Sequence, residues 1–187
     1  TPNPPYIDIP NPVGTYRTSF TVPSNWKDRE VMLHFGSITG YARVYVNGKD
    51  VGMTKCSKTP AEFDVTPYLV SGNNNLAVQV YRYHDGSYME DQDFWRITGI
   101  EREVYLQAYQ KSCVWDYAIE ATPTDQYRNG SFKADVTVRN FGKASANASL
   151  LLRLLDTNGK VVYQESKTVK GQGECQELSF AKAIKQV

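Results

Sequence analysis

The sequence predicts an all-β protein made of two consecutive β-sandwiches. Apolar and polar residues alternate with a period of two along most of the chain, turn residues interrupt it at short intervals, and no helical stripe of useful length occurs. Aromatic residues make up 12% of the chain and include 13 tyrosines, a composition that favours strands. A chain of 187 residues has room for two small domains and is too short for a barrel enzyme with accessory modules.

A first block of predicted strands lies within residues 1–110. Strands are expected at residues 15–22, 31–35, 42–46, 49–53, 62–65, 76–81 and 104–109. The first of them alternates as a half-buried strand does. Asn47-Gly48 predicts a hairpin turn, because both central positions of that turn need positive φ. Thr66-Pro67 predicts one short helical turn with Thr66 as its N-cap, and His84-Asp85-Gly86 turns the chain into a loop.

The pattern restarts after residue 110, so residues 111–187 form a second block. Strands are expected at residues 114–121, 132–139, 148–155, 161–167 and 178–183, with turn residues at Asn129-Gly130, Phe141-Gly142, Asn158-Gly159 and 171–173. These are five strands in about 75 residues, whereas an immunoglobulin-like sandwich normally has seven strands in about 100 residues. We therefore expect the chain to end inside a domain. Its first residue is Thr1, which suggests processing or excision from a longer protein.

Composition argues against several classes of partner. The chain has 21 basic and 20 acidic residues, so its electrostatic attraction for a nucleic acid would be weak. No apolar run approaches the roughly 20 residues of a membrane-spanning helix.

His34 and His84 have no nucleophile or acid at a telling spacing and are expected to be ordinary polar positions. The three cysteines match no metal-ligand or disulfide spacing and are expected to be free thiols: Cys56, Cys113 and Cys175.

The segment from residue 85 to residue 104 carries most of the chemical information. It places Glu90, Asp91 and Asp93 within a few residues of Trp95 and Arg96. Three carboxylates in one loop repel one another unless a cation, an arginine or hydrogen-bond donors lie between them. Arg96 is one candidate, because it can hold a carboxylate in a bidentate pair. A hard cation that takes oxygen ligands is the other.

The residues alone leave three interpretations of this segment open. In the structural one, Trp95 is buried, Arg96 is its polar neighbour and the acids form a solvated loop. In the second, a sugar stacks on the aromatic side chains and donates hydrogen bonds to the carboxylates. In the third, Glu90 and Asp93 are the acid and base of a glycosidase. Nothing in the sequence places one acid in an apolar environment and the other in a polar one, which such a pair needs.

This segment resembles the signature that closes the N-terminal sugar-binding domain of the large bacterial β-galactosidases of glycoside hydrolase family 2. The matching residues are Glu90-Asp91-Gln92-Asp93, Trp95-Arg96, Gly99-Ile100 and Arg102. Upstream residues that match as well are Asn11-Pro12, Gly14, Tyr16, Asn47-Gly48, Gly52, Ser57, Pro60, Glu62-Phe63-Asp64 and Gly72. The resemblance is strong over residues 3–110. The rest of the chain resembles, less specifically, the immunoglobulin-like domain that follows in that family.

The resemblance implies a jelly-roll, galactose-binding-like sandwich over residues 1–110 that lacks its first strands. It implies an immunoglobulin-like sandwich over residues 111–187 that lacks its C-terminal strands. In the complete enzyme a (β/α)₈ barrel would follow and hold both catalytic carboxylates, hydrolysing terminal β-galactosides with retention. Sodium and magnesium are the ions expected in that enzyme, and a homo-oligomer is its expected assembly. This chain alone is expected to have no catalytic residue, no cofactor and no activity.

The same resemblance assigns roles to individual residues. Asp93 would reach the active site of the complete enzyme, help to bind the galactose 6-hydroxyl region and ligate the sodium ion. Glu90 and Asp91 would fix the loop through backbone amides or Arg96, and Trp95 with Arg96 would hold it on the sandwich. The alternative function is a stand-alone carbohydrate-binding or adhesion module that binds glycan through its own loops, and a structural spacer is a third possibility.

Overall fold

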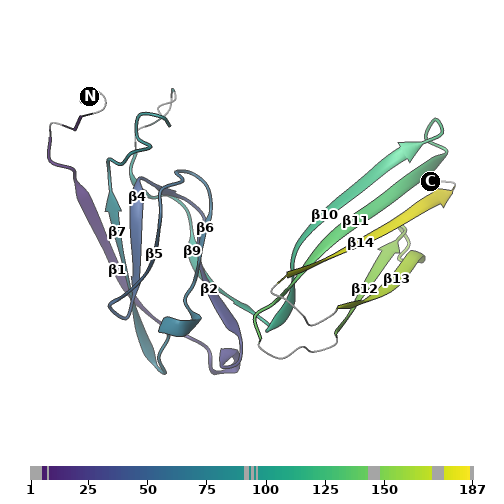
Figure 1. Ribbon diagram of the computed structural model, residues 1–187, viewed down its shortest axis with the longest axis horizontal. Coiled ribbons are helices and arrows are strands. Elements are labelled where there is room, and N and C mark those ends of the chain that lie inside the picture. The colour runs from purple at the N-terminus through teal and green to yellow at the C-terminus, as the bar shows by residue number, and fades with distance from the viewer. Residues whose placement is uncertain are drawn as a thin grey trace. The chain divides into compact units, whose positions relative to one another are not determined.

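The computed structural model describes residues 6–7, 9–90, 93, 95, 97–142, 148–169 and 175–185 (Figure 1). These residues contain fourteen strands, two short 3₁₀ turns and no α-helix, which confirms the predicted all-β class. Within that part of the chain, no helix is long and apolar enough to cross a membrane. The chain divides into two compact units, Thr1–Tyr109 and Gln110–Val187, and each has its own core.

The first unit is a β-sandwich. Its strands are β1 (Val13–Thr21), β2 (Glu30–Phe35), β3 (Ile38–Thr39), β4 (Tyr41–Val46), β5 (Lys49–Thr54), β6 (Ala61–Asp64), β7 (Asn73–Tyr81), β8 (Gly99–Ile100) and β9 (Val104–Tyr109). One sheet has the order β1-β7-β4-β5 and the other the order β6-β2-β9, while β3 pairs with β8. All these pairings are antiparallel. The 3₁₀ turns η1 (Ser24–Trp26) and η2 (Thr66–Tyr68) precede β2 and β7.

Alternation with a period of two builds the core of this unit. On the central strand β7, one face is buried and carries Leu76, Val78 and Val80, and its neighbour β4 buries Ala42, Val44 and Val46. The other sheet contributes three residues of β2: Val31, Leu33 and Phe35. Removing these side chains from water is the main force that holds the two sheets together.

The edge strand β1 corrects one prediction. Eight of its nine residues are exposed and only Phe20 is partly buried, so the strand is not half-buried as expected. Tyr16 pairs with the buried Val78 and shares its face of the sheet, yet 43% of its surface is exposed. The physical reason is the place of β1 at the edge, because the described part of the other sheet leaves this face of the strand uncovered.

The turn at residue 66 corrects a second prediction. Thr66 is not the N-cap of the short helical turn, because Val65 holds that position and makes no side-chain cap. The hydroxyl Oγ1 of Thr66 instead accepts a hydrogen bond from the backbone N–H of Val31 at 2.8 Å. The carboxylate of Asp64 accepts one from the N–H of Thr66 at 2.9 Å. The threonine therefore ties the turn to β2.

A fully buried asparagine joins the β4–β5 hairpin to the start of β7. Asn74 is 0% exposed. Its Oδ1 accepts hydrogen bonds from the N–H of Val70 and from Nδ2 of Asn47, each at 2.8 Å, and its Nδ2 donates to the carbonyls of Val70 and Gly72 at 3.1 and 3.2 Å. The predicted hairpin turn is confirmed, with φ of 52° at Asn47 and 77° at Gly48. Every polar atom of the Asn74 side chain has a partner, as a buried amide requires.

The second unit is a smaller sandwich. Its described strands are β10 (Ser112–Thr124), β11 (Asn129–Asn140), β12 (Ala148–Leu155), β13 (Val161–Val169) and β14 (Cys175–Lys185). They form sheets of order β10-β11-β14 and β12-β13. The core between them contains Phe132, Ala134, Val136, Val138, Val169, Leu178 and Phe180. The predicted free thiols are confirmed at Cys56, Cys113 and Cys175.

One turn of this unit lies earlier than predicted. Asn129 and Gly130 were expected to form a turn, but they begin β11 and pair with the end of β10. The turn is made by the residues before them, three of which have positive φ: Asp125, Gln126 and Tyr127. The side chain of Asn129 donates a hydrogen bond to Asp125 at 3.1 Å and so closes this longer connection. The turn predicted at Asn158-Gly159 is confirmed, with φ of 80° at Gly159.

Candidate functional site

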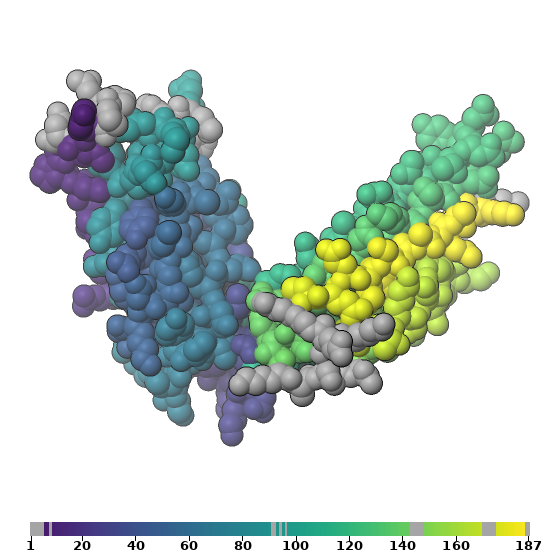
Figure 2. Space-filling model, viewed as in Figure 1, coloured from purple at the N-terminus to yellow at the C-terminus, as the bar shows by residue number. Residues whose placement is uncertain are grey.

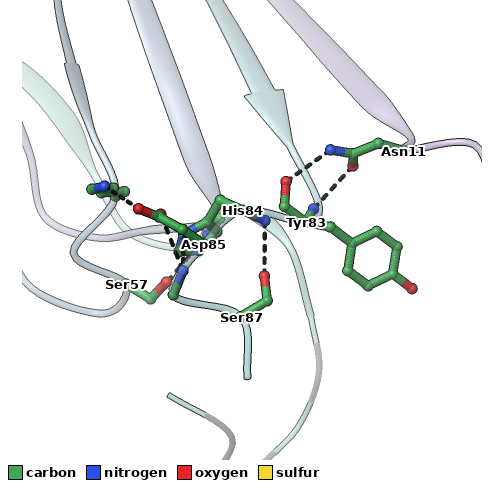
Figure 3. Close-up of polar contacts among 9 residues, drawn as sticks. Asn11, Ser57, Tyr83, His84, Asp85 and Ser87 are labelled. Carbon is green, nitrogen blue, oxygen red and sulfur yellow. Dashed lines mark hydrogen bonds and ion pairs between the residues drawn. The ribbon is translucent and has the colours of Figure 1, made fainter. Parts of the chain in front are cut away.

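The acidic segment follows β7 at one end of the first unit. In Figure 2 the teal atoms of this region lie at the same end of the unit as the purple N-terminal atoms. Asn11 fixes the point where the loop leaves the sheet. Its Nδ2 donates to the carbonyl of Tyr83 at 2.7 Å, and its Oδ1 accepts from the N–H of Tyr83 at 3.0 Å (Figure 3). Two hydrogen bonds thus clamp the start of the loop to a residue 72 positions away.

The loop continues as a compact turn (Figure 3). The N–H of His84 donates to Oγ of Ser87 at 2.9 Å, and the N–H of Ser87 donates to the carbonyl of His84 at 3.1 Å. The N–H of Gly86 donates to both Nδ1 of His84 and Oδ1 of Asp85, each at 3.1 Å. The N–H of Glu90 then donates to the carbonyl of Gly86 at 2.9 Å. These contacts give the backbone from residue 84 to residue 90 a defined shape.

An ion pair connects this turn to the end of β5. Lys55 pairs with the Oδ2 atom of Asp85. The hydrogen bond from Lys55 lowers the pKa of the Asp85 carboxyl, and the same bond raises the pKa of Lys55. Both side chains are exposed, so water and salt screen the pair and it adds little to stability. Its consequence is geometric, because it holds the turn beside β5.

The structure describes some of the predicted site residues and not others. Glu90 and Asp93 are exposed. Trp95 is 79% exposed, so the interpretation in which Trp95 is buried is wrong. Asp91 and Arg96 lie outside the described residues, so their predicted roles stay predictions. In the part of the chain that the structure describes, no three His, Cys, Asp or Glu side chains converge to hold a metal ion. The sodium ion predicted at Asp93, with ligands from the rest of the enzyme, stays a prediction.

A cavity of about 470 Å³ lies where the acidic segment returns to the sandwich. It is lined by Tyr16, Lys58, Trp95, Ile97, Thr98, Gly99, Ile100, Glu101 and Arg102. Gly99 is required here, because a Cβ atom would lie 2.7 Å from the hydroxyl of Tyr16 and the residue has a φ of 138°. Trp95 lines the cavity wall with most of its surface exposed, so its predicted role in holding the loop on the sandwich stays a prediction.

A polar network fixes the far end of the segment. Lys58 donates to both carboxylate oxygens of Glu101 at 2.8 and 3.1 Å, and the hydroxyls of Thr39 and Ser37 donate to them at 2.9 and 3.3 Å. The hydrogen bond from Lys58 is the main cause that lowers the pKa of Glu101. The loop that carries Asp93 is therefore anchored at both ends. Lys58 and Glu101 lie 43 positions apart and carry no local motif, so the sequence alone does not predict their pairing.

Replacing Glu101 by glutamine is expected to lower the free energy of unfolding by about 1 kcal/mol at pH 7, since hydrogen bonds to a charged group are lost from a partly exposed site. The pKa of Glu101 is lower in the folded chain than its ordinary value of 4.5. The ionised Glu101 therefore contributes its full stabilisation of the fold when the pH is above the ordinary pKa. This contribution is lost as the pH falls through the lowered pKa of the folded chain. Urea unfolding at pH 7 and pH 3 should show the difference between wild type and variant shrinking at pH 3.

The neighbouring exposed Glu103, replaced by glutamine, is the matched control and should leave the unfolding free energy within about 0.5 kcal/mol of wild type at both pH values. A Glu101→Gln loss of the same size at pH 3 and pH 7 would contradict the role of its charge.

Comparison with known proteins identifies relatives of the chain. Residues 1–110 match the family model described as glycosyl hydrolases family 2, sugar binding domain. The β-galactosidase of Priestia megaterium is 39% identical over 155 residues, which are 82% of this chain and 15% of that protein. The β-galactosidase of Lactobacillus delbrueckii subsp. bulgaricus is 36% identical over 169 residues, or 90% of this chain and 16% of that protein. The chain thus spans about 15% of the length of these curated relatives.

Solved structures share the fold at lower identity. The β-glucuronidase of Bacteroides uniformis matches with a TM-score of 0.81 and 23% identity, over 95% of this chain and 22% of that one. A putative β-galactosidase from Bacteroides fragilis matches with the same TM-score at 22% identity, over 95% of this chain and 28% of that one. Both units of the chain therefore have the architecture found in these enzymes.

Proposed function

The chain belongs to the glycosyl hydrolases of family 2, and from this membership we propose that it is the non-catalytic N-terminal part of a retaining β-galactosidase. The observation that carries the proposal is its identity of 39% and 36% to two β-galactosidases. The solved β-glucuronidase, at 23% identity, supports the fold and not a substrate. Because the chain spans about 15% of its curated relatives, the proposed enzyme is several times longer than this chain.

The catalytic carboxylates of this enzyme are proposed to lie outside the chain, in its barrel domain. In retaining glycosidases one carboxylic acid protonates the leaving group while a second carboxylate, about 5 Å away, attacks the sugar. We assign neither role to Glu90 or Asp93. The contribution of this chain to the reaction is to bind and orient the substrate, and alone it is expected to be inactive.

Asp93 is proposed to complete the rim of the substrate pocket. It is exposed, and the loop that carries it is anchored by Asn11 at its start and by Glu101 at its end. An ionised carboxylate accepts hydrogen bonds from sugar hydroxyls, and the galactose 6-hydroxyl region is the proposed partner. Sodium would bind Asp93 only with ligands from the rest of the enzyme, and magnesium would bind elsewhere in it.

The second unit is proposed to be completed by further strands of the longer protein. On β10, Tyr117 and Ile119 pair with the buried residues Val136 and Ala134 and share their face of the sheet. Their exposed fractions are nevertheless 65% and 59%. Additional strands beside β12 would cover this apolar face, as burial of apolar surface favours. Association of full-length subunits into a homo-oligomer is part of the same proposal.

The first test is the size of the native polypeptide. Antibodies raised against the chain should detect, in a lysate of the source cells, a polypeptide several times longer than the 187 residues of the chain. That band should copurify with hydrolysis of a chromogenic β-galactoside. A band at the size of the chain itself, together with micromolar glycan affinity, would support a stand-alone binding module instead. Hydrolysis of β-glucuronides without hydrolysis of β-galactosides would contradict the proposed substrate.

A further inference from the structure

We propose that His84 is a positioning residue whose neutral imidazole sets the shape of the acidic loop, an inference that rests on the proposed function of Asp93. The side chain of His84 is only 8% exposed. Its Nδ1 accepts the N–H of Gly86 at 3.1 Å. A ring nitrogen that accepts a hydrogen bond carries no proton, so this contact assigns the proton of the neutral ring to Nε2.

The imidazole and the backbone of Gly86 fit closely together. Gly86 is buried, and a Cβ atom there would lie 2.8 Å from Cε1 and 3.1 Å from Nδ1 of His84. Only glycine allows the ring to lie this close to the backbone. The position of the ring and the path of the main chain at Gly86 are therefore coupled.

A short series of contacts leads from the ring to the acidic residues. His84 holds the N–H of Gly86, and the carbonyl of Gly86 accepts the N–H of Glu90 at 2.9 Å. Glu90 lies three positions before Asp93 in the chain. These contacts carry a change at the His84 ring to the backbone of Glu90, without any contact between His84 and the substrate.

The charged groups around the ring determine what protonation does. Oδ1 of Asp85 lies 3.5 Å from Nδ1 of His84, and Asp85 is held from β5 by Lys55. Oε1 of Glu90 lies 3.4 Å from the position that a Cβ atom of Gly86 would occupy. A protonated Nδ1 donates instead of accepting, so it would lose Gly86 and turn to Asp85.

The hydrogen bond can be tested in the 187-residue chain itself. The amide resonance of Gly86 is compared by NMR, at one pH, in wild type, His84→Asn and His84→Ala. In His84→Asn the side-chain oxygen can replace Nδ1 as acceptor, so the resonance should stay close to its wild-type position. In His84→Ala that acceptor is missing, so the resonance should move away from it. A Gly86 resonance that is the same in wild type and His84→Ala would overturn the inference.

The positioning role is tested in the full-length enzyme. His84→Ala should lower kcat/KM for a β-galactoside about tenfold, whereas His84→Asn, which keeps an acceptor for the N–H of Gly86, should stay within about twofold of wild type. His34→Asn, at a partly exposed histidine on β2, is the control and should keep the wild-type kcat/KM. If neither His84 variant changes kcat/KM although Asp93→Ala lowers it, the positioning role fails. If Asp93→Ala also has no effect, the proposed function fails.

Discussion

Replacing Asn74 by leucine is expected to destabilise the first unit by about 4 kcal/mol. The substitution keeps a similar volume, so its cost comes from hydrogen bonds and not from a cavity. The substitution would remove four hydrogen bonds. The N–H and carbonyl of Val70 and the carbonyl of Gly72 would lose their partner, and Nδ2 of Asn47 would lose one of its acceptors. A buried polar group left unsatisfied costs about 1–3 kcal/mol. Val70 and Gly72 are exposed residues, so water reaches their backbone groups and reduces the sum.

Urea unfolding followed by circular dichroism measures this loss. Asn75→Leu is the matched control, because Asn75 is the next residue of β7 and its side chain is exposed on the other face. The control should change the free energy of unfolding by no more than about 0.5 kcal/mol. If Asn74→Leu costs less than about 1 kcal/mol, the network does not hold the hairpin and the start of β7 together.

In the full-length enzyme, Asp93→Ala is expected to reduce kcat/KM for a β-galactoside about 10- to 150-fold. This corresponds to a loss of about 1.5–3 kcal/mol in transition-state stabilisation. This is the range for a hydrogen bond to a charged group, and the proposal gives Asp93 one such bond to the sugar. Asp93→Asn keeps an acceptor oxygen but no charge, so its loss should be smaller. Steady-state rates at several substrate concentrations give kcat/KM for each variant.

The matched control is Asp28→Ala, at an exposed carboxylate in the connection between η1 and β2. It should leave kcat/KM unchanged. Asp93→Ala should also leave the free energy of unfolding within about 0.5 kcal/mol of wild type, since the side chain is exposed. Unchanged turnover in Asp93→Ala would instead assign the chain the role of a structural spacer.

Strand positions could be predicted where alternation and turn chemistry agree. The spacing of Leu76, Val78 and Val80 predicts β7, because a period of two places all three on one buried face. Alternation around Tyr16 correctly predicts a strand but not its exposure, since a sequence does not show which strand lies at a sheet edge. An Asn-Gly pair favours a turn, but at Asn129 the strand pairing extends through it and residues 125–128 form the turn.

The candidate site could be predicted only in part. The residues around Asp93 form a continuous motif, whereas the contacts that anchor their loop join residues far apart. Lys55 and Asp85 are 30 positions apart, and sheet topology rather than local sequence brings them together. The position of Asn74 could have been found from its place in the alternating pattern of β7. It is a polar residue in phase with the buried Leu76, and a polar residue at a core position needs partners.

The exposure of Trp95 also makes the acidic loop visible to fluorescence. The chain contains three tryptophans. Trp26 packs against the core of the first unit, and Trp115 is partly buried with its ring 4.6 Å from the guanidinium carbon of Arg139. A neutral quencher in solution therefore reaches Trp95 first. Emission from this residue, two positions from Asp93, can report on ligand contact with the loop without any added label.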